Sequence, residues 1–269
     1  MKSTLSTLVI LVVGLASASA NERLFTYTYE PETMPKGGWE FENWVTARDG
    51  RNDNVGQKDF HEWEFRQSVE YGVTDNWTTE LYFNSHQQSF RDPVSGNRHT
   101  DFRWDGISLE NRYQVWNQAD HPVGLTLYLE PRISDSGGEI EAKVILGQRY
   151  GQWKWAMNLT HEAEWFNHFH NCEGETELSF GLARMIGKHW AVGFEFRDNA
   201  ELEEYKVWDN NAFYAGPVVA YRADRWWASL AFMPQVFGNN FPDNPDGNPN
   251  LELEDHERWN TRLIFGINF

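Results

Sequence analysis

The chain has 269 residues, a formal net charge of -17 at pH 7 and a polar mean hydropathy of -0.66, yet 16% of its residues are aromatic. So acidic a chain lacks the basic surface that nucleic-acid binding requires, which excludes that class of function. An aromatic-rich sequence with a polar average is typical of a membrane β-barrel, which has an apolar outer face and a charged interior.

The first twenty residues predict a secretory signal peptide. Lys2 supplies the basic start, residues 8–15 form an apolar run, and Ala18-Ser19-Ala20 offers a small-residue cleavage site. This run is too short for a membrane-spanning helix, and no later stretch approaches the roughly 18 apolar residues that such a helix needs. A single cysteine, Cys172, excludes an internal disulfide. We therefore expect an exported protein that is secreted, periplasmic or inserted as a barrel.

Residues 21–36 are interpreted as a periplasmic lead-in segment, with the barrel mouth as one place into which it would tuck. Phe25, Tyr27 and Tyr29 alternate as in a strand, but Pro31 and Pro35 follow closely. Prolines at this density disfavour a central strand.

From Trp39 onward the sequence alternates apolar and polar residues with the period of two that marks β-strands. At Asp105-Gly106 the alternation slips by one residue, which predicts a β-bulge. Trp44 and Ile264 interrupt the polar faces of the first and last strands. Twelve strands are predicted, over residues 39–48, 60–72, 77–90, 100–116, 123–133, 139–150, 153–165, 173–184, 190–197, 207–221, 226–237 and 258–269.

Short turns alternate with mostly longer, polar connections along the chain. The short turns lie near 73–76, 117–122, 151–152, 185–189 and 222–225, and the longer connections near 49–59, 91–99, 134–138, 167–172, 198–206 and 238–255. An up-and-down barrel with both termini in the periplasm requires this alternation. The predicted fold is therefore all-β, a single up-and-down antiparallel transmembrane β-barrel of about twelve strands over residues 37–269, in the bacterial outer membrane.

Aromatic residues gather toward both ends of the predicted strands. Those beside the short turns are Tyr71, Trp77, Tyr113, Trp116, Tyr150, Trp153, Trp190, Tyr221, Trp226 and Phe269, and those toward the loops are Trp63, Trp104, Trp165 and Trp259. Two aromatic belts that bracket an apolar band are typical of contact with membrane lipid. Outer-membrane lipid and lipopolysaccharide are the expected surroundings.

The closing strand, residues 258–269, is predicted to complete the barrel by pairing with residues 39–48. Its aromatic end looks like the C-terminal signal of bacterial outer-membrane barrels, so barrel-assembly machinery is an expected partner. In this pairing Arg258 and Arg262 are expected to face Glu40 and Glu42.

Charged residues at inward positions are the largest candidate site. They are Glu40, Glu42, Glu62, Glu64, Arg66, Glu110, Arg112, Glu130, Arg132, Lys143, Arg149, Lys154, Glu195, Arg197, Arg258 and Arg262. One interpretation is a charged pore that selects small solutes. The other is a set of ion pairs that hold a narrow wall together. Twelve strands lie between the filled eight-stranded and the open sixteen-stranded barrels, so both interpretations stay open.

Two loops resemble metal sites in composition. His161, His168, His170 and Cys172 supply ligand types without a standard zinc spacing, so a polar surface loop is favoured. Residues 243–250 are rich in Asp and Asn around a glycine, as a calcium loop requires, but their prolines and the absence of a closing glutamate depart from that pattern. No cofactor is predicted, and calcium on this loop is the lesser alternative.

No nucleophile with an adjacent base is apparent. Ser85 and His86 are neighbours on a strand and so point to opposite faces. The chain is therefore expected not to be an enzyme, and an outer-membrane enzyme is the third hypothesis after a channel and a binding barrel.

Several stretches resemble a family of uncharacterised outer-membrane β-barrel proteins of Gram-negative bacteria. They are residues 22–33, 35–37, 108–113, 124–131 and 145–149 with the closing strand, and the resemblance covers nearly the whole mature chain. It implies the fold and the location and assigns no catalytic or binding residue. We predict a passive, porin-like channel for small solutes with a charged lumen. The alternative is a closed structural or binding barrel whose acidic loops bind divalent cations, lipopolysaccharide or a surface partner.

Overall fold

The computed structural model of the protein describes residues 23–51, 58–92, 94–241 and 250–269, so the predicted signal peptide lies outside the described residues. Within these ranges twelve antiparallel strands close into one barrel, which confirms the predicted fold. No helix in the same ranges is long and apolar enough to cross a membrane. The strands are β1 (Trp39–Asp49), β2 (Lys58–Thr74), β3 (Trp77–Arg91), β4 (Arg98–Trp116), β5 (Gly124–Ile133), β6 (Gly138–Tyr150), β7 (Trp153–Phe166), β8 (Asn171–Ile186), β9 (Trp190–Glu203), β10 (Val207–Arg222), β11 (Trp226–Asn240) and β12 (Trp259–Asn268).

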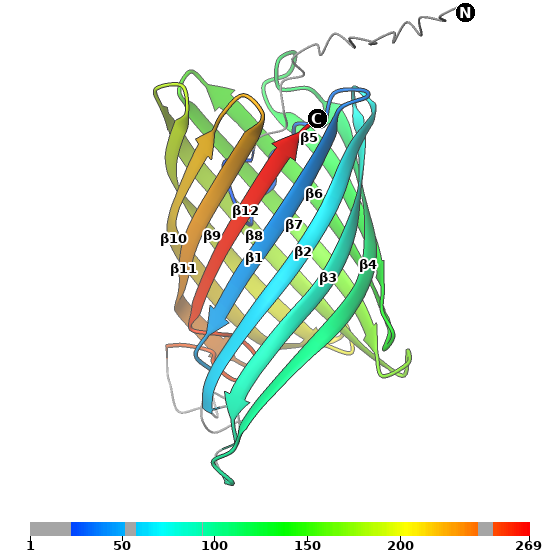
Figure 1. The fold of residues 1–269 in the computed structure, drawn as a ribbon, viewed down its shortest axis with the longest axis vertical. Helices are drawn as coiled ribbons and strands as arrows, with labels where there is room; N and C mark the ends of the chain where they lie inside the picture. Colours follow the sequence, from blue (N-terminus) through cyan, green and yellow to red (C-terminus); the bar gives the residue numbers. More distant parts are fainter. Residues whose placement is uncertain (1–22, 52–57, 93, 242–249) are drawn as a thin grey trace, which may run out of the picture.

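Each strand pairs with its neighbours in the chain, and β12 pairs with β1 to close the barrel. Because strand direction alternates, the connections 75–76, 117–123, 151–152, 187–189 and 223–225 lie at one end, together with the C-terminus (top of Figure 1). We call this the short-turn end. The connections at 50–57, 92–97, 134–137, 167–170, 204–206 and 241–258 form the opposite, loop end.

One predicted connection is much shorter in the structure. The expected loop at 198–206 reduces to a turn at 204–206, in which Glu204 and Tyr205 have positive φ angles of 47° and 60°. The preceding residues, Asp198 to Glu203, pair with both β8 and β10. Their sequence is polar because alternate side chains face a charged interior, and this polarity made a paired strand resemble a loop.

The predicted β-bulge is confirmed. Asn84 of β3 pairs with Gly106 of β4, and the next residue, Ser85, pairs with Trp104, so Asp105 is the extra residue. Gly106 has a φ of +91°, and a Cβ there would lie 1.8 Å from the carbonyl oxygen of Ile133. Glycine is required at this position both for its backbone angle and for the space.

The predicted charge pairs across the β1–β12 seam are wrong. Glu40 pairs with Asn268 and Glu42 with Gly266, whereas Arg262 lies four residues further along, opposite Thr46. Arg262 Nε donates a hydrogen bond of 2.9 Å to the Thr46 hydroxyl. The two strands pair as predicted, but their register depends on the closure of the whole barrel. Strand periodicity alone leaves this register undetermined.

Candidate functional site

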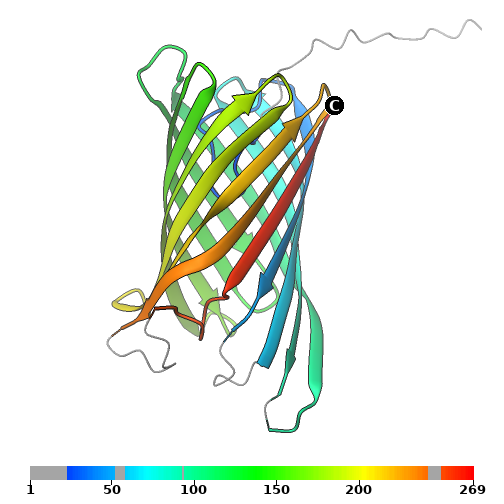
Figure 2. The same cartoon turned by 90° about the vertical axis from the view of Figure 1, so that its left-hand side faces the viewer.

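Residues 23–36 lie inside the barrel, in the half nearer the short-turn end (blue in Figure 2). We call them the inner segment. Phe25, Thr26 and Thr28 have no exposed surface. The sequence predicts a periplasmic lead-in here, and the structure places its described part within the barrel interior.

Glu195 of β9 anchors the inner segment through its backbone. One carboxylate oxygen accepts hydrogen bonds from the Thr26 amide (2.9 Å) and hydroxyl (3.0 Å), and the other accepts the amides of Tyr27 and Thr28, both at 2.9 Å. Hydrogen bonds to a charged acceptor are stronger than neutral ones. A single carboxylate therefore satisfies three consecutive buried amides.

Side-chain pairs fix the next part of the inner segment. Asn158 of β7 accepts the Tyr29 amide at 2.6 Å and donates to the Tyr29 carbonyl at 2.9 Å. Lys154, also on β7, lies 2.6 Å from Glu32 and 3.7 Å from Glu30. These contacts hold the segment against β7 as well as β9.

Inward glycines leave room for the inner segment. A Cβ on Gly181 would lie 2.5 Å from the Phe25 ring, and one on either Gly124 or Gly147 would lie 2.8 Å from the Pro31 ring. Because Gly124 and Gly147 pair directly across β5 and β6, they form a single recess for the proline. The segment therefore fits a surface that the barrel sequence forms for it.

The two residues that interrupt the polar faces of the end strands also contact this region. Trp44 and Ile264 pair with each other across the β1–β12 seam and belong to a buried cluster with Tyr29 and Tyr82. The Trp44 ring lies 6.2 Å from the ring of Tyr29 and 5.9 Å from that of Tyr82. These apolar exceptions form part of the interior core that packs on the inner segment.

A cavity of about 820 Å³ lies on the loop side of the inner segment. Tyr27 and Tyr29 of the inner segment form its floor, and residues of the loop-end connections, such as Ser134 and His256, also line it. Of the described residues that line it, fourteen are carboxylates and eight are arginine or lysine. The cavity is therefore charged on its walls and acidic in balance.

A continuous row of glutamates follows the cross-strand pairing from β1 to β9. Seven of its eight neighbouring pairs are direct cross-strand partners, and the eighth pair, Glu110 and Glu130, occupies matching positions between the pairs Ser108–Arg132 and Arg112–Tyr128. We call this the glutamate row. Its members are Glu40, Glu70, Glu80, Glu110, Glu130, Glu141, Glu162, Glu175 and Glu201.

The glutamate row connects the two ends of the barrel. Glu40 is the second residue of β1, at the short-turn end, and Glu201 lies near the last residue of β9, at the loop end. Strands in a barrel are tilted, so a line across them climbs along the barrel axis. The five members from Glu130 to Glu201 line the cavity, and the four from Glu40 to Glu110 are buried on the inner-segment side.

Like charges directly opposite each other destabilise a sheet, so this arrangement opposes stability. Partial compensation comes from Arg66, which lies 2.5 Å from Glu130, and from Lys143, which lies 2.7 Å from Glu141. Glu162, in the middle of the cavity wall, forms no ion pair within the described part of the chain. Departures from folding rules of this kind are expected where a surface serves a function.

The opposite wall, formed by β12, β1 and β2, has its charges paired. Arg48 lies 2.8 Å from Glu64 and 3.9 Å from Glu257, and Arg262 lies 3.8 Å from Glu64. Arginines nearby hold the pKa of Glu257 below its usual range against the desolvation that would raise it. The cavity therefore has one neutralised wall and one acidic wall.

The structure places most of the predicted lumen residues inside the barrel. Buried are Glu40, Glu42, Glu110, Arg112, Glu130, Lys154, Glu195 and Arg197, and Glu62, Glu64, Arg66, Arg132, Lys143 and Arg262 are half-buried. Arg149 and Arg258 are exposed. Arg258 precedes β12, and its guanidinium lies over the Trp259 ring at 5.4 Å.

The predicted lumen residues do not include Glu70, Glu80, Glu141, Glu162, Glu175 and Glu201, which complete the glutamate row. Each occupies an inward position of its strand, and that was the available signal. Their alignment required the register between strands.

The predicted aromatic belt residues have exposed or half-buried side chains. Trp63, Trp77, Trp104, Tyr113, Trp116, Tyr150, Trp153, Trp190, Trp226, Trp259 and Phe269 are exposed, and Tyr71, Trp165 and Tyr221 are half-buried. Several contact one another, as Trp190 and Tyr221 do edge to face with their ring centroids 4.7 Å apart. Their role in lipid contact stays a prediction.

The predicted metal loops have different outcomes. Most of the calcium-like stretch 243–250 lies outside the described residues. Within the described ranges, His161, His168, His170 and Cys172 do not gather, and a rim group at the loop end consists of Glu201, Asp209 and Asp255. Burial lowers the pKa of nearby His256 to about 3, so its neutral ring leaves the charge of this group in place.

Docking of the inner segment should depend on pH through Glu30. Burial raises the pKa of Glu30 to about 7, and Lys154, Glu32 and Arg23 are the charged groups that face it. Between about pH 4.5 and 7, Glu30 is therefore protonated in the docked form and ionised in the undocked form. Docking is therefore strongest below about pH 4.5 and weakens as the pH rises through 7, by up to about 1.4 kcal/mol per unit.

Limited proteolysis of the segment at about pH 5.5 and pH 8 measures this effect, with greater protection expected in acid. The variant Glu30→Gln should lose the difference. Lys154 also holds the pKa of Glu32 below its usual range despite its desolvation, so Glu32 acts only at lower pH. Equal protection at both pH values in the unaltered protein would contradict the assignment.

Substitution of Arg112 should destabilise the barrel strongly. Its guanidinium lies 2.6 Å from Glu70 and 2.5 Å from Glu110, and all three side chains are buried. Removing one partner of a buried ion pair costs about 3–5 kcal/mol, so Arg112→Met should lower the urea midpoint in detergent micelles. Arg103→Met on the same strand is the matched control, because the ion pair of Arg103 is exposed and contributes about 1 kcal/mol or less.

Comparison with solved structures gives outer-membrane barrels. The COG4313 outer membrane channel from Pseudomonas putida F1 is 9% identical, and the alignment covers 91% of this chain and 100% of that one with a TM-score of 0.61. A bacterial polysaccharide outer membrane secretin is 10% identical, with coverage of 86% and 97% and a TM-score of 0.43. An anion-selective porin from Comamonas acidovorans is 7% identical, with coverage of 86% and 98% and a TM-score of 0.37.

Likeness at these identities shows the fold alone, which agrees with the barrel described above. No curated protein matches the sequence. A family model described as "Family of unknown function (DUF6662)" matches residues 17–269, nearly the whole chain. The protein therefore belongs to the DUF6662 family of unknown function, and its described residues form a closed β-barrel.

Proposed function

We propose that this protein is an outer-membrane channel for small solutes that favours cations. The observation that carries the proposal is the glutamate row on the wall of the 820 Å³ cavity, with Glu162 at its centre and without an ion pair in the described residues. Rings and rows of carboxylates inside a barrel attract cations and exclude anions. The paired charges on the opposite wall leave this preference intact.

In this proposal the loop end faces the outside and the short-turn end, with both termini, faces the periplasm. Short turns on the periplasmic side are the usual arrangement in such barrels. Solutes enter the cavity from the loop end and meet the floor formed by Tyr27 and Tyr29. Passage then requires the inner segment to shift, so the segment acts as the gate.

Planar-bilayer recording of the purified mature chain tests the proposal. Under a potassium chloride gradient we expect a reversal potential of cation-selective sign. A variant that lacks residues 21–33 should conduct more strongly with the same preference. Absence of conductance from both proteins over a range of voltages, or an anion preference, would refute the proposal.

A second candidate is a closed barrel that binds divalent cations at its loop rim. The rim group of Glu201, Asp209 and Asp255 favours it, because these carboxylates lie close enough to share one ion. Calorimetric titration with calcium separates the two candidates. The binding barrel would be supported if the heat of calcium binding disappears in the variant Asp209→Asn/Asp255→Asn and the protein shows no conductance in planar bilayers.

A further inference from the structure

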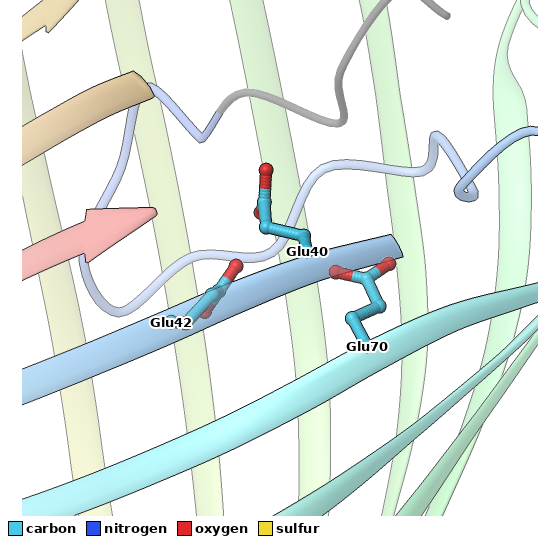
Figure 3. Close-up of side chains that lie close together, drawn as sticks. All are labelled: Glu40, Glu42 and Glu70. Carbon is cyan, nitrogen blue, oxygen red and sulfur yellow. The ribbon is translucent and has the colours of Figure 1, made fainter. Parts of the chain in front are cut away.

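Three carboxylates from two strands meet at the short-turn end of the barrel interior (Figure 3). Glu40 and Glu42 project from β1 and Glu70 from β2, and one oxygen of each lies within 4.8 Å of the others. All three side chains are buried, with at most 2% exposed. Calcium binds oxygen at 2.3–2.6 Å, so opposite ligands of one ion lie about 4.6–5.2 Å apart. The three oxygens therefore fit around one calcium ion.

Glu80 of β3 provides a second, independent observation. It pairs with Glu70 in register, is 1% exposed, and its Oε1 accepts no hydrogen bond within the described part of the chain. Its charge lies beside those of Glu42 and Glu70. The Oε1 atom of Glu40 likewise accepts no hydrogen bond there. A buried carboxylate oxygen without a donor is costly, and a bound cation would satisfy both oxygens.

The local balance of charge also favours a cation. Five carboxylates, which are Glu40, Glu42, Glu70, Glu80 and Glu110, are buried together. Two guanidinium groups accompany them: Arg112 lies within 4 Å of three of the carboxylates, Glu70, Glu80 and Glu110, and Arg23 stacks over aromatic rings at 3.9 and 4.5 Å. Three negative charges remain when all five are ionised, and a divalent ion would offset two.

We propose that Glu40, Glu42 and Glu70, with Glu80, bind one calcium ion inside the barrel. None of the four lines the cavity, so the site is distinct from the proposed solute path and from the rim group. The ion would join β1, β2 and β3 beneath the inner segment. Binding of this ion is measured at equilibrium, so the proposed site can be tested independently of channel conductance.

Two tryptophans make the site directly observable. Trp227 Nε1 donates to Glu40 at 2.9 Å, and Trp44 Nε1 donates to Glu42 at 2.6 Å. Terbium takes calcium sites and emits when a neighbouring tryptophan is excited. We expect the full chain, purified in detergent and treated with a chelator, to give terbium emission that calcium displaces. The variant Trp227→Phe should lower the intensity and leave the stoichiometry unchanged.

Paired variants assign the emission to this site. Glu40→Gln/Glu70→Gln should abolish the tryptophan-sensitised emission and one equivalent of bound calcium, whereas Asp209→Asn/Asp255→Asn at the rim should retain both. Glutamine keeps the side-chain shape and relieves charge repulsion, and Arg112 keeps Glu80 and Glu110 as charged partners when Glu70 is replaced. We therefore expect the variant to fold, and circular dichroism checks this. Glu80→Gln, a milder change, should weaken calcium binding.

Emission that survives Glu40→Gln/Glu70→Gln and disappears in the rim variant would overturn the proposal. The same holds if the unaltered protein takes up no calcium, because protons would then neutralise the buried carboxylates. Absence of conductance in planar bilayers combined with normal calcium binding would refute the channel proposal and support the calcium site.

Discussion

Replacement of Glu195 by alanine should undock the inner segment and raise the channel conductance. The change removes the acceptor of three consecutive buried amides and one hydroxyl. Each buried donor left unpaired costs about 1–3 kcal/mol, so even a loss of about 3 kcal/mol raises the undocked fraction about 100-fold. Single-channel recording and limited proteolysis of residues 21–36 measure the two consequences together.

Two further variants make this result specific. Glu203→Ala changes an exposed glutamate on the same strand and should leave conductance and protection as they are. Gly181→Val should act like Glu195→Ala by a different route, because a side chain there meets the Phe25 ring at 2.5 Å. If Glu195→Ala and Gly181→Val both keep the conductance and protection of the parent, the inner segment is no gate.

Neutralising the centre of the acidic wall should remove most of the cation preference. Glu162 and Glu175 are direct cross-strand neighbours on the cavity wall, and Glu175 is held by a 2.8 Å hydrogen bond from Asn199. At an effective dielectric constant of about 20, each charge contributes up to about 4 kcal/mol to a cation 4 Å away. The variant Glu162→Gln/Glu175→Gln should therefore lower the cation-to-anion permeability ratio about tenfold or bring it close to one.

Reversal potentials under a salt gradient give this ratio directly. Removal of two exposed loop-end charges, in Glu203→Gln/Glu204→Gln, is the control and should change it little. The preference of the parent should also fall between 0.1 and 1 M salt, because the screening length shortens from about 10 to about 3 Å. A ratio that Glu162→Gln/Glu175→Gln leaves unchanged would place the selectivity elsewhere in the lumen.

The surroundings of the inner segment could be predicted only in part from local sequence features. Trp44, Ile264 and the inward glycines Gly124, Gly147 and Gly181 are visible in the sequence as departures from the polar inner face. Each contacts the inner segment or belongs to the core around it. Their spacing marks an apolar, recessed patch inside the barrel. It does not identify the occupant, because residues 23–36 are distant in sequence from most of the strands that they contact.

The residues of the glutamate row could be predicted from the sequence, but their alignment could not. An inward glutamate on each of nine strands is a consequence of local alternation and is readable from the sequence. Whether those nine residues align depends on eight separate registers, and a slip of two residues in any strand keeps the same face while breaking the row. The misplaced pairing of Arg262 with Glu42 has the same cause.

Local sequence patterns were enough to predict the twelve strands, the bulge at Gly106, the alternating connections and the face of most side chains. These features follow from steric and solvation rules that act within a few residues. Three arrangements became visible only in the folded barrel: the inner segment fills one half of it, nine glutamates form one row, and Glu40, Glu42 and Glu70 converge. Those arrangements arise when the barrel closes, since closure sets every register at once and leaves an interior that a distant part of the chain can fill.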